Sequence, residues 1–129
     1  MAGRGRVLIV DDDPVVGQTF ARMLVVPGYE VTVVQSGDAA FERAVSDPPD
    51  VIIVDLRMPV SDGLAFIARL RRDSRLRELP VAVVTGDHFI DEPRKHALAA
   101  LGATVHFKPL QVDQFVALVD SLLAGGRGA

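Results

Sequence analysis

The hydrophobic residues of this chain alternate between two spacings along its whole length. Short runs rich in Val and Ile, such as residues 7–10 and 51–54, are almost continuously apolar. They are separated by stretches whose apolar residues recur at the three- and four-residue spacing of an amphipathic helix. Continuous apolar strands are typical of a parallel sheet that is covered by helices on both faces. We therefore predict an α/β fold built from five strand–helix units.

Turn and capping signals divide the chain into these units. Asp13 is suited to cap a first helix that begins at Pro14, and Gly102 suits the left-handed position after a fourth helix. Right-handed crossovers in a doubly wound parallel sheet would then leave the loops after strands one, three, four and five near one another. The expected strands are residues 7–10, 30–34, 51–54, 81–84 and 104–107, and the expected helices are 14–26, from 36 or 37 to before 48, from 61 to about 70, 91–101 and 112–123.

Length and composition favour a single domain over residues 1–129. The chain has no Cys, a formal net charge of −3 and no apolar run long enough to cross a bilayer. We expect a core at about residues 6–123, a glycine-rich tail at 124–129 that does not order itself, and a location in the cytoplasm. The charge gives no reason to expect binding to nucleic acid or membranes. One basic cluster is expected to be a solvated helix end; it comprises Arg69, Arg71, Arg72, Arg75 and Arg77.

Polar residues follow four of the predicted strands and would meet at one edge of the sheet. They are Asp11, Asp12, Asp13, Asp55, Thr85 and Lys108. The carboxyl edge of an open parallel sheet is where such folds bind ligands. Adjacent carboxylates repel each other unless a cation lies among them, so Asp11 and Asp12 are candidate metal ligands. Asp13 is better placed as a helix cap. Thr85 and Lys108 indicate a functional site only in combination with the aspartates.

Five sequence pieces, taken in order, carry a resemblance to a known family. They are VLIVDDDP at 7–14, VIIVDLRMP at 51–59, DGLAF at 62–66, VVTGD at 83–87 and FKPL at 107–110. Over residues 6 to about 123 the chain resembles the response-regulator receiver domain of bacterial two-component signalling. The resemblance implies that Asp55 is the phosphoacceptor, Asp11 and Asp12 the acidic pair, Thr85 the switch hydroxyl and Lys108 the family's lysine. It also implies a doubly wound, flavodoxin-like parallel sheet with strand order 2-1-3-4-5 and a cis peptide bond between Lys108 and Pro109.

The implied chemistry is phosphoryl transfer to a carboxylate, which needs the charge on the transferring oxygens to be neutralised. Mg²⁺, with Mn²⁺ as an alternative, suits a site of a few hard oxygen ligands. We assign Asp12 and Asp55 as direct ligands and Asp11 as a water-mediated ligand, and the resemblance adds the backbone carbonyl of Arg57. Lys108 and Thr85 would contact phosphoryl oxygens. Arg57 and Asp87 would form a salt bridge over the site that slows hydrolysis.

The resemblance is incomplete at one position. Receiver domains usually carry an aromatic switch residue three positions before the lysine, and Val105 stands there in this chain. Either Val105 or His106 occupies the switch site. With Val105, Thr85 would have to communicate by backbone shift or helix repacking, and with His106 the switch would respond to pH.

These expectations describe a signalling switch and not a conventional enzyme. A histidine kinase or histidine phosphotransfer protein would phosphorylate Asp55, and the face formed by helix 4, strand 5 and helix 5 would then bind an unidentified output protein or a second copy of the chain. A stand-alone receiver and a fragment of a larger regulator are both compatible with the sequence.

Three alternatives were weighed against this function. A phosphate-independent docking module, or pseudo-receiver, is the main one. A phosphatase with an aspartate nucleophile would need a second carboxylate where Arg57 stands, and a flavin phosphate would be repelled by the aspartates at 11–13.

Overall fold

The structure is a computed structural model that describes residues 4–55, 60–86 and 90–126. Five strands alternate with five helices, as predicted from the apolar pattern. They are β1 (Gly5–Val10), α1 (Pro14–Val25), β2 (Tyr29–Val34), α2 (Gly37–Ser46), β3 (Val51–Asp55), α3 (Val60–Arg72), β4 (Val81–Thr85), α4 (Glu92–Ala100), β5 (Ala103–Phe107) and α5 (Val112–Gly126).

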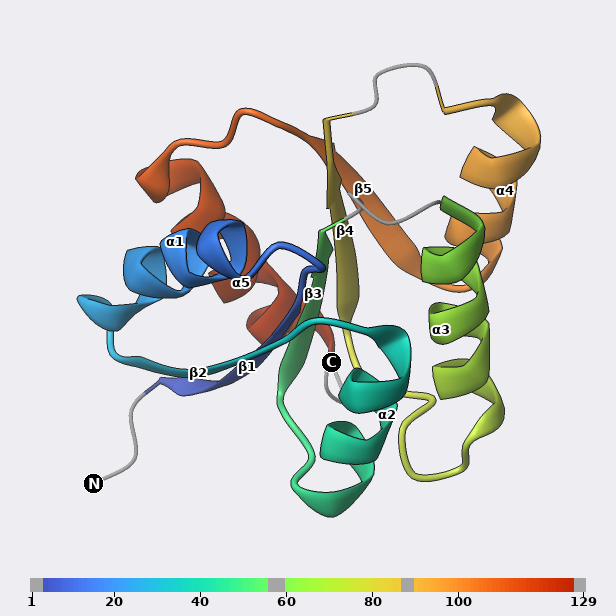
Figure 1. Ribbon diagram of the computed structural model, residues 1–129, viewed down its shortest axis with the longest axis horizontal. Helices are drawn as coiled ribbons and strands as arrows, with labels where there is room; N and C mark the ends of the chain where they lie inside the picture. Colours follow the sequence, from blue (N-terminus) through green and yellow to red (C-terminus); the bar gives the residue numbers. More distant parts are fainter. Residues whose placement is uncertain (1–3, 56–59, 87–89, 127–129) are drawn as a thin grey trace.

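The strands form one parallel sheet in the order β2-β1-β3-β4-β5, which confirms the predicted doubly wound topology. Helices α1 and α5 lie on one face, and α2, α3 and α4 lie on the other (Figure 1). Each face has its own hydrophobic core, and residues of β1, β3 and β4 contribute alternately to both. The apolar runs of these strands are continuous because both of their faces are buried.

The helix starts follow the capping signals of the sequence. Asp13 caps α1, and its carboxylate accepts hydrogen bonds from the backbone N–H groups of Val15 at 2.9 Å and Val16 at 3.5 Å. Asp91 likewise accepts from Arg94 N–H at 2.9 Å at the start of α4. Gly102 has a φ of +73° after α4, as predicted for a helix C-terminal glycine.

Helix α1 passes unusually close to β2 at Gly17. A Cβ atom at this buried position would lie 2.6 Å from Cγ1 of Val33 and 3.5 Å from Cβ of Asp11. Only a residue without a side chain fits such a separation. Gly17 thus allows α1 to pack beside the residues that follow β1.

The C-terminal end of α5 differs from the prediction. The tail was expected to begin at Ala124, but α5 continues to Gly126. Leu122 and Leu123 in its last turns pack against the core that α1 and α5 share. That packing stabilises the helix, and adding residues to an existing helix costs little compared with starting one, which outweighs the poor helix propensity of glycine.

The basic cluster around α3 was expected to be a solvated helix end, and this is wrong for Arg71. Arg71 is half-buried and donates to the backbone carbonyls of Leu101 at 2.6 Å, Leu79 at 2.6 Å and Arg77 at 2.9 Å. Burial lowers the pKa of Arg71. The Arg69 guanidinium lies 3.9 Å from the centre of the Phe41 ring and also pairs with Asp38 at 3.0 Å. Arg71 therefore holds segments together, and the exposed Arg69 links α3 to α2.

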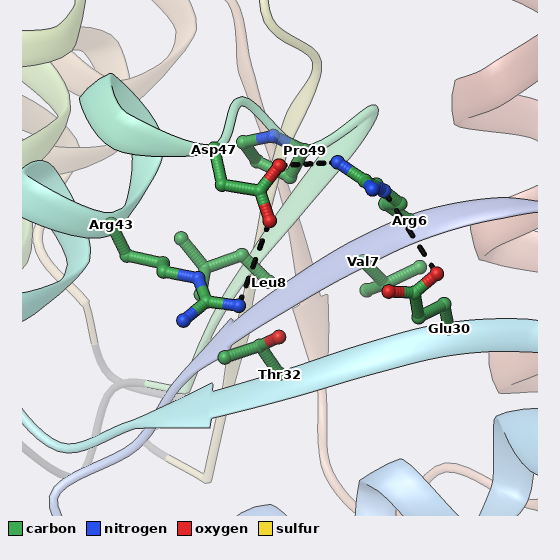
Figure 2. Close-up of a pocket in the computed structure, with 8 residues that line it drawn as sticks. All are labelled: Arg6, Val7, Leu8, Glu30, Thr32, Arg43, Asp47 and Pro49. Carbon is green, nitrogen blue, oxygen red and sulfur yellow. Dashed lines mark hydrogen bonds and ion pairs between the residues drawn. The ribbon is translucent and has the colours of Figure 1, made fainter.

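A second group of charged side chains lies at the opposite edge of the sheet from the predicted site. Figure 2 shows Arg6 between Asp47 and Glu30, with Arg43 also directed at Asp47. Arg6 Nε lies 3.9 Å from Glu30, and Arg43 Nη2 lies 3.6 Å from Asp47. The two arginines and two carboxylates of these partly exposed ion pairs cancel in charge around the starts of β1 and β2. The group therefore offers no net charge to attract a ligand.

Candidate functional site

The sheet brings four of the predicted site residues to its carboxyl edge. Asp55 and Thr85 are the last residues of β3 and β4, while Asp11 and Lys108 directly follow β1 and β5. Within the described ranges 4–55, 60–86 and 90–126, Asp11, Asp55 and Thr85 are the only buried polar or charged residues. Buried polar groups are costly unless partners compensate them, so their concentration at one edge indicates a functional site.

Lys108 forms an ion pair with Asp55. Its Nζ atom lies 2.7 Å from each carboxylate oxygen and donates a hydrogen bond to Oδ2. The backbone N–H of Lys108 also donates to the carbonyl of Thr85 at 2.8 Å, so β4 and β5 position the side chain jointly. The Lys108–Pro109 peptide bond is cis, as the family resemblance implied.

Asp11 is a buried carboxylate, and the positive charge near it is too small to balance both its own negative charge and that of Asp55. Its Oδ1 accepts a hydrogen bond from Asp13 N–H at 2.9 Å, while Oδ2 has no hydrogen-bond partner in the part of the chain that the structure describes. Burial raises the pKa of Asp11 to about 7, helped by the adjacent Asp55 carboxylate and opposed by Asp13 N–H and Lys108. One lysine therefore faces two carboxylates.

The carboxylates fit a divalent cation in part. Asp11 Oδ2 is a buried oxygen that accepts no hydrogen bond from the described residues, and Asp55 Oδ1 is a buried oxygen that forms an ion pair with Lys108. Hard oxygens of this kind are what Mg²⁺ prefers. Asp12, the other predicted ligand, is exposed at the same loop. Among the described side chains, no three His, Cys, Asp or Glu residues form a ready metal-binding group. The complete ligand set stays a prediction.

Two predicted contributions lie outside the described residues. Arg57, whose backbone carbonyl was expected to bind the metal, is one of them, and Asp87 is the other. The proposed Arg57–Asp87 salt bridge over the site therefore stays a prediction as well.

The structure distinguishes the two candidates for the switch position. Val105 packs against the core on the α2, α3 and α4 side of the sheet. Side chains of a strand alternate between faces, so His106 lies on the other face, where its Nε2 is 3.0 Å from Thr104 Oγ1. Burial lowers the pKa of His106. Of the two, Val105 is the residue on the side of α4.

The sequence did not indicate one neighbour of the site. The Nζ atom of Lys108 lies 5.7 Å from the centre of the Phe20 ring, which belongs to α1. Phe20 stands at an apolar position of an amphipathic helix, so nothing in its spacing separates it from ordinary core residues. Only the packed structure reveals the contact.

Comparison with known sequences agrees with this geometry. The family described as the response regulator receiver domain matches residues 7–120. The chain belongs to this family. Two relatives of this receiver chain are the DNA-binding dual master transcriptional regulator RpaA of a Synechocystis species and the response regulator MprA of Mycolicibacterium vanbaalenii. Each is 35% identical over 92% of this chain, which spans 48% and 50% of their lengths. The chain thus spans about half of these relatives.

Solved structures show the same receiver fold. The chemotaxis response regulator CheY4 of Vibrio cholerae superposes with a TM-score of 0.80 at 29% identity, covering 95% of this chain and 100% of CheY4. A signal receiver domain of a histidine kinase from Syntrophus aciditrophicus gives 0.82 at 29% identity, covering 97% of this chain and 94% of that domain. No helix within the described ranges is long and apolar enough to span a membrane.

Proposed function

We propose that this receiver domain is a switch operated by phosphorylation of Asp55. The observation that carries the proposal is the buried carboxylate of Asp55 at the end of β3, with the Lys108 ammonium 2.7 Å from its oxygens. A histidine kinase or a histidine phosphotransfer protein is the proposed donor. Such a switch catalyses its own modification but is not a conventional enzyme.

The chemistry follows from the groups in place. An Asp55 oxygen attacks the phosphorus of the donor, an oxygen–phosphorus bond forms, and the bond from phosphorus to the donor nitrogen breaks. Lys108 and the Thr85 hydroxyl then contact phosphoryl oxygens. A bound Mg²⁺ or Mn²⁺ would neutralise charge on the phosphoryl group, and Asp11, Asp12 and Asp55 would hold it.

The proposed output is a population shift of the face formed by α4, β5 and α5. Lys108 is tied to Asp55 by its side chain and to Thr85 by its backbone, and it directly follows β5. A change at Asp55 therefore acts first on the β4–β5 pair. The partner on this face is a further protein or a second copy of the chain, and the net charge of −3 gives no broad electrostatic reason to expect the domain itself to bind nucleic acid.

The decisive experiment is intact-protein mass spectrometry after incubation with acetyl phosphate and Mg²⁺. We expect one labile phosphoryl adduct on the wild-type protein, and none on Asp55→Asn or with EDTA. Absence of the adduct from the folded wild-type protein under all conditions would refute the proposal and favour a phosphate-independent docking module.

A further inference from the structure

The ammonium group of Lys108 lies close to both a carboxylate and an aromatic ring. Its Nζ atom is 2.7 Å from the Asp55 oxygens and 5.7 Å from the centre of the Phe20 ring. Phe20 is 6% exposed and is itself packed on Phe115 of α5, with ring centres 4.8 Å apart and planes inclined at 50°. Helices α1 and α5 thus hold an aromatic ring near the lysine.

The distance is within the range of a cation–π interaction. A lysine ammonium within about 6 Å of a ring centre is attracted by the negative face of the ring, and the attraction grows where water is excluded. The Lys108 side chain is 22% exposed, so most of it is shielded from solvent. Without a contact on the ammonium, the long aliphatic side chain could adopt many rotamers and place the ammonium in many positions.

This ring has a property that Asp55 lacks: its attraction for the ammonium does not change during phosphorylation. When Asp55 becomes an acyl phosphate, one of its oxygens enters the new bond and negative charge moves onto the phosphoryl oxygens. Lys108 then has to exchange its carboxylate partner for a phosphoryl oxygen. An aromatic face that stays in place limits where the ammonium can move during this exchange.

We propose that Phe20 is a positioning residue for phosphoryl transfer, acting on the Lys108 ammonium through the face of its ring. The inference rests on the proposed function, because it concerns the reaction at Asp55. It differs from ordinary core packing in one respect. Replacing the ring by an aliphatic side chain of suitable size should slow the reaction even when the fold is retained.

Phe115 supplies the matched control. It is fully buried, belongs to the same core and forms the other half of the aromatic pair. Within the described residues, Lys108 has a cation–π contact with Phe20 and none with Phe115. Phe20→Leu and Phe115→Leu therefore both remove one ring of the pair, but only the first removes the ring beside the ammonium.

The first measurement is the rate of phosphorylation by acetyl phosphate at saturating Mg²⁺. We expect Phe20→Leu to slow it about fivefold, which corresponds to about 1 kcal/mol, the usual size of a partly shielded cation–π interaction. Phe115→Leu is expected to stay within about twofold of the wild-type rate. Urea unfolding of both variants confirms that the proteins compared are folded, and Phe20→Met serves as a second variant without a ring if the leucine variant unfolds.

The second measurement reports the position of Lys108 directly. Protons beside an aromatic ring experience its ring current, so the Lys108 Hε resonances of the unphosphorylated protein should move by NMR in Phe20→Leu. They should stay near the wild-type position in Phe115→Leu. This shift tests whether the ring lies beside Lys108, and the difference in rate between the two variants then separates a positioning role from structural support.

Equal rates and equal Lys108 resonances in the two variants would overturn the inference, and so would a wild-type rate in Phe20→Leu. In each case the wild-type adduct on Asp55 would still stand, so the proposed function would survive. Absence of that adduct from the wild-type protein would instead refute both.

Discussion

The buried carboxylate of Asp11 makes a specific stability prediction. Asp11→Asn should stabilise the metal-free protein at pH 8. Asparagine keeps the oxygen that accepts from Asp13 N–H at 2.9 Å, and its amide can donate toward Asp55. The substitution removes the negative charge that lies buried beside a second carboxylate.

The magnitude follows from the pKa of Asp11. Its ordinary value of 3.8 is raised to about 7 in the folded protein, so the folded state binds more protons than the unfolded state between these two values. The free energy of unfolding therefore falls as the pH rises from about 4 to about 7. At about 1.36 kcal/mol for each pH unit, the full effect is on the order of 4 kcal/mol, and exchange with water near the site would reduce it to roughly 2–4 kcal/mol.

The assay is urea unfolding at pH 5 and pH 8, each with EDTA and with Mg²⁺. In EDTA the wild-type protein should lose stability between the two pH values, whereas Asp11→Asn should lose much less. A cation among the carboxylates offsets their repulsion, so Mg²⁺ should stabilise the wild type at pH 8 more than the variant. Asp12→Asn is the control, because Asp12 is exposed in the same loop and should change the metal-free stability by less than about 0.5 kcal/mol. The same pH dependence in wild type and Asp11→Asn would show that this reasoning is wrong.

Three further substitutions test other contacts by chemical denaturation. Lys108→Met leaves Asp55 without its cation and should destabilise the metal-free protein at pH 8 by about 2 kcal/mol. Lys95→Met, at a partly exposed lysine, is the control, and an unchanged stability of Lys108→Met would contradict the ion pair. Gly17→Ala places a Cβ 2.6 Å from a methyl group of β2 and should lower the free energy of unfolding by about 1–3 kcal/mol despite the helix propensity of alanine. An unchanged stability would show that α1 can move away from β2. Arg71→Met removes three hydrogen bonds to carbonyls and should lower the free energy of unfolding by about 2–3 kcal/mol. Amide exchange near Gly102 should become faster, and unchanged exchange there would contradict the contact between Arg71 and Leu101.

The fold, and the meeting of Asp55, Thr85 and Lys108 at one edge of the sheet, could be predicted because they depend on local rules. Continuous apolar strands require cover on both faces, and the carboxyl ends of parallel strands meet at a common edge, so the sequence alone predicts that these three residues lie together. The caps at Asp13 and Gly102 follow equally from backbone chemistry.

Contacts between distant helices could not be predicted. The position of the Phe20 ring beside Lys108 depends on how α1 and α5 pack, and the choice between Val105 and His106 depends on the register of an edge strand. The basic cluster misled for a similar reason. Arg71 donates a hydrogen bond to Leu101, thirty positions along the chain, and no local sequence pattern predicts such a contact.

The Arg71 contacts bear on where foreign sequence can be inserted into this domain. The connection between α3 and β4 is a surface loop, the kind of segment that usually tolerates insertions and tags. Here the carbonyls of Arg77 and Leu79 in that loop share one guanidinium with Leu101 at the end of α4. Lengthening the loop would pull these acceptors apart and disturb two units of the fold at once. The turn at residues 26–28 is the better site, because Val26 is 94% exposed, and the insertion should leave Gly28 in place because its φ of +100° favours glycine.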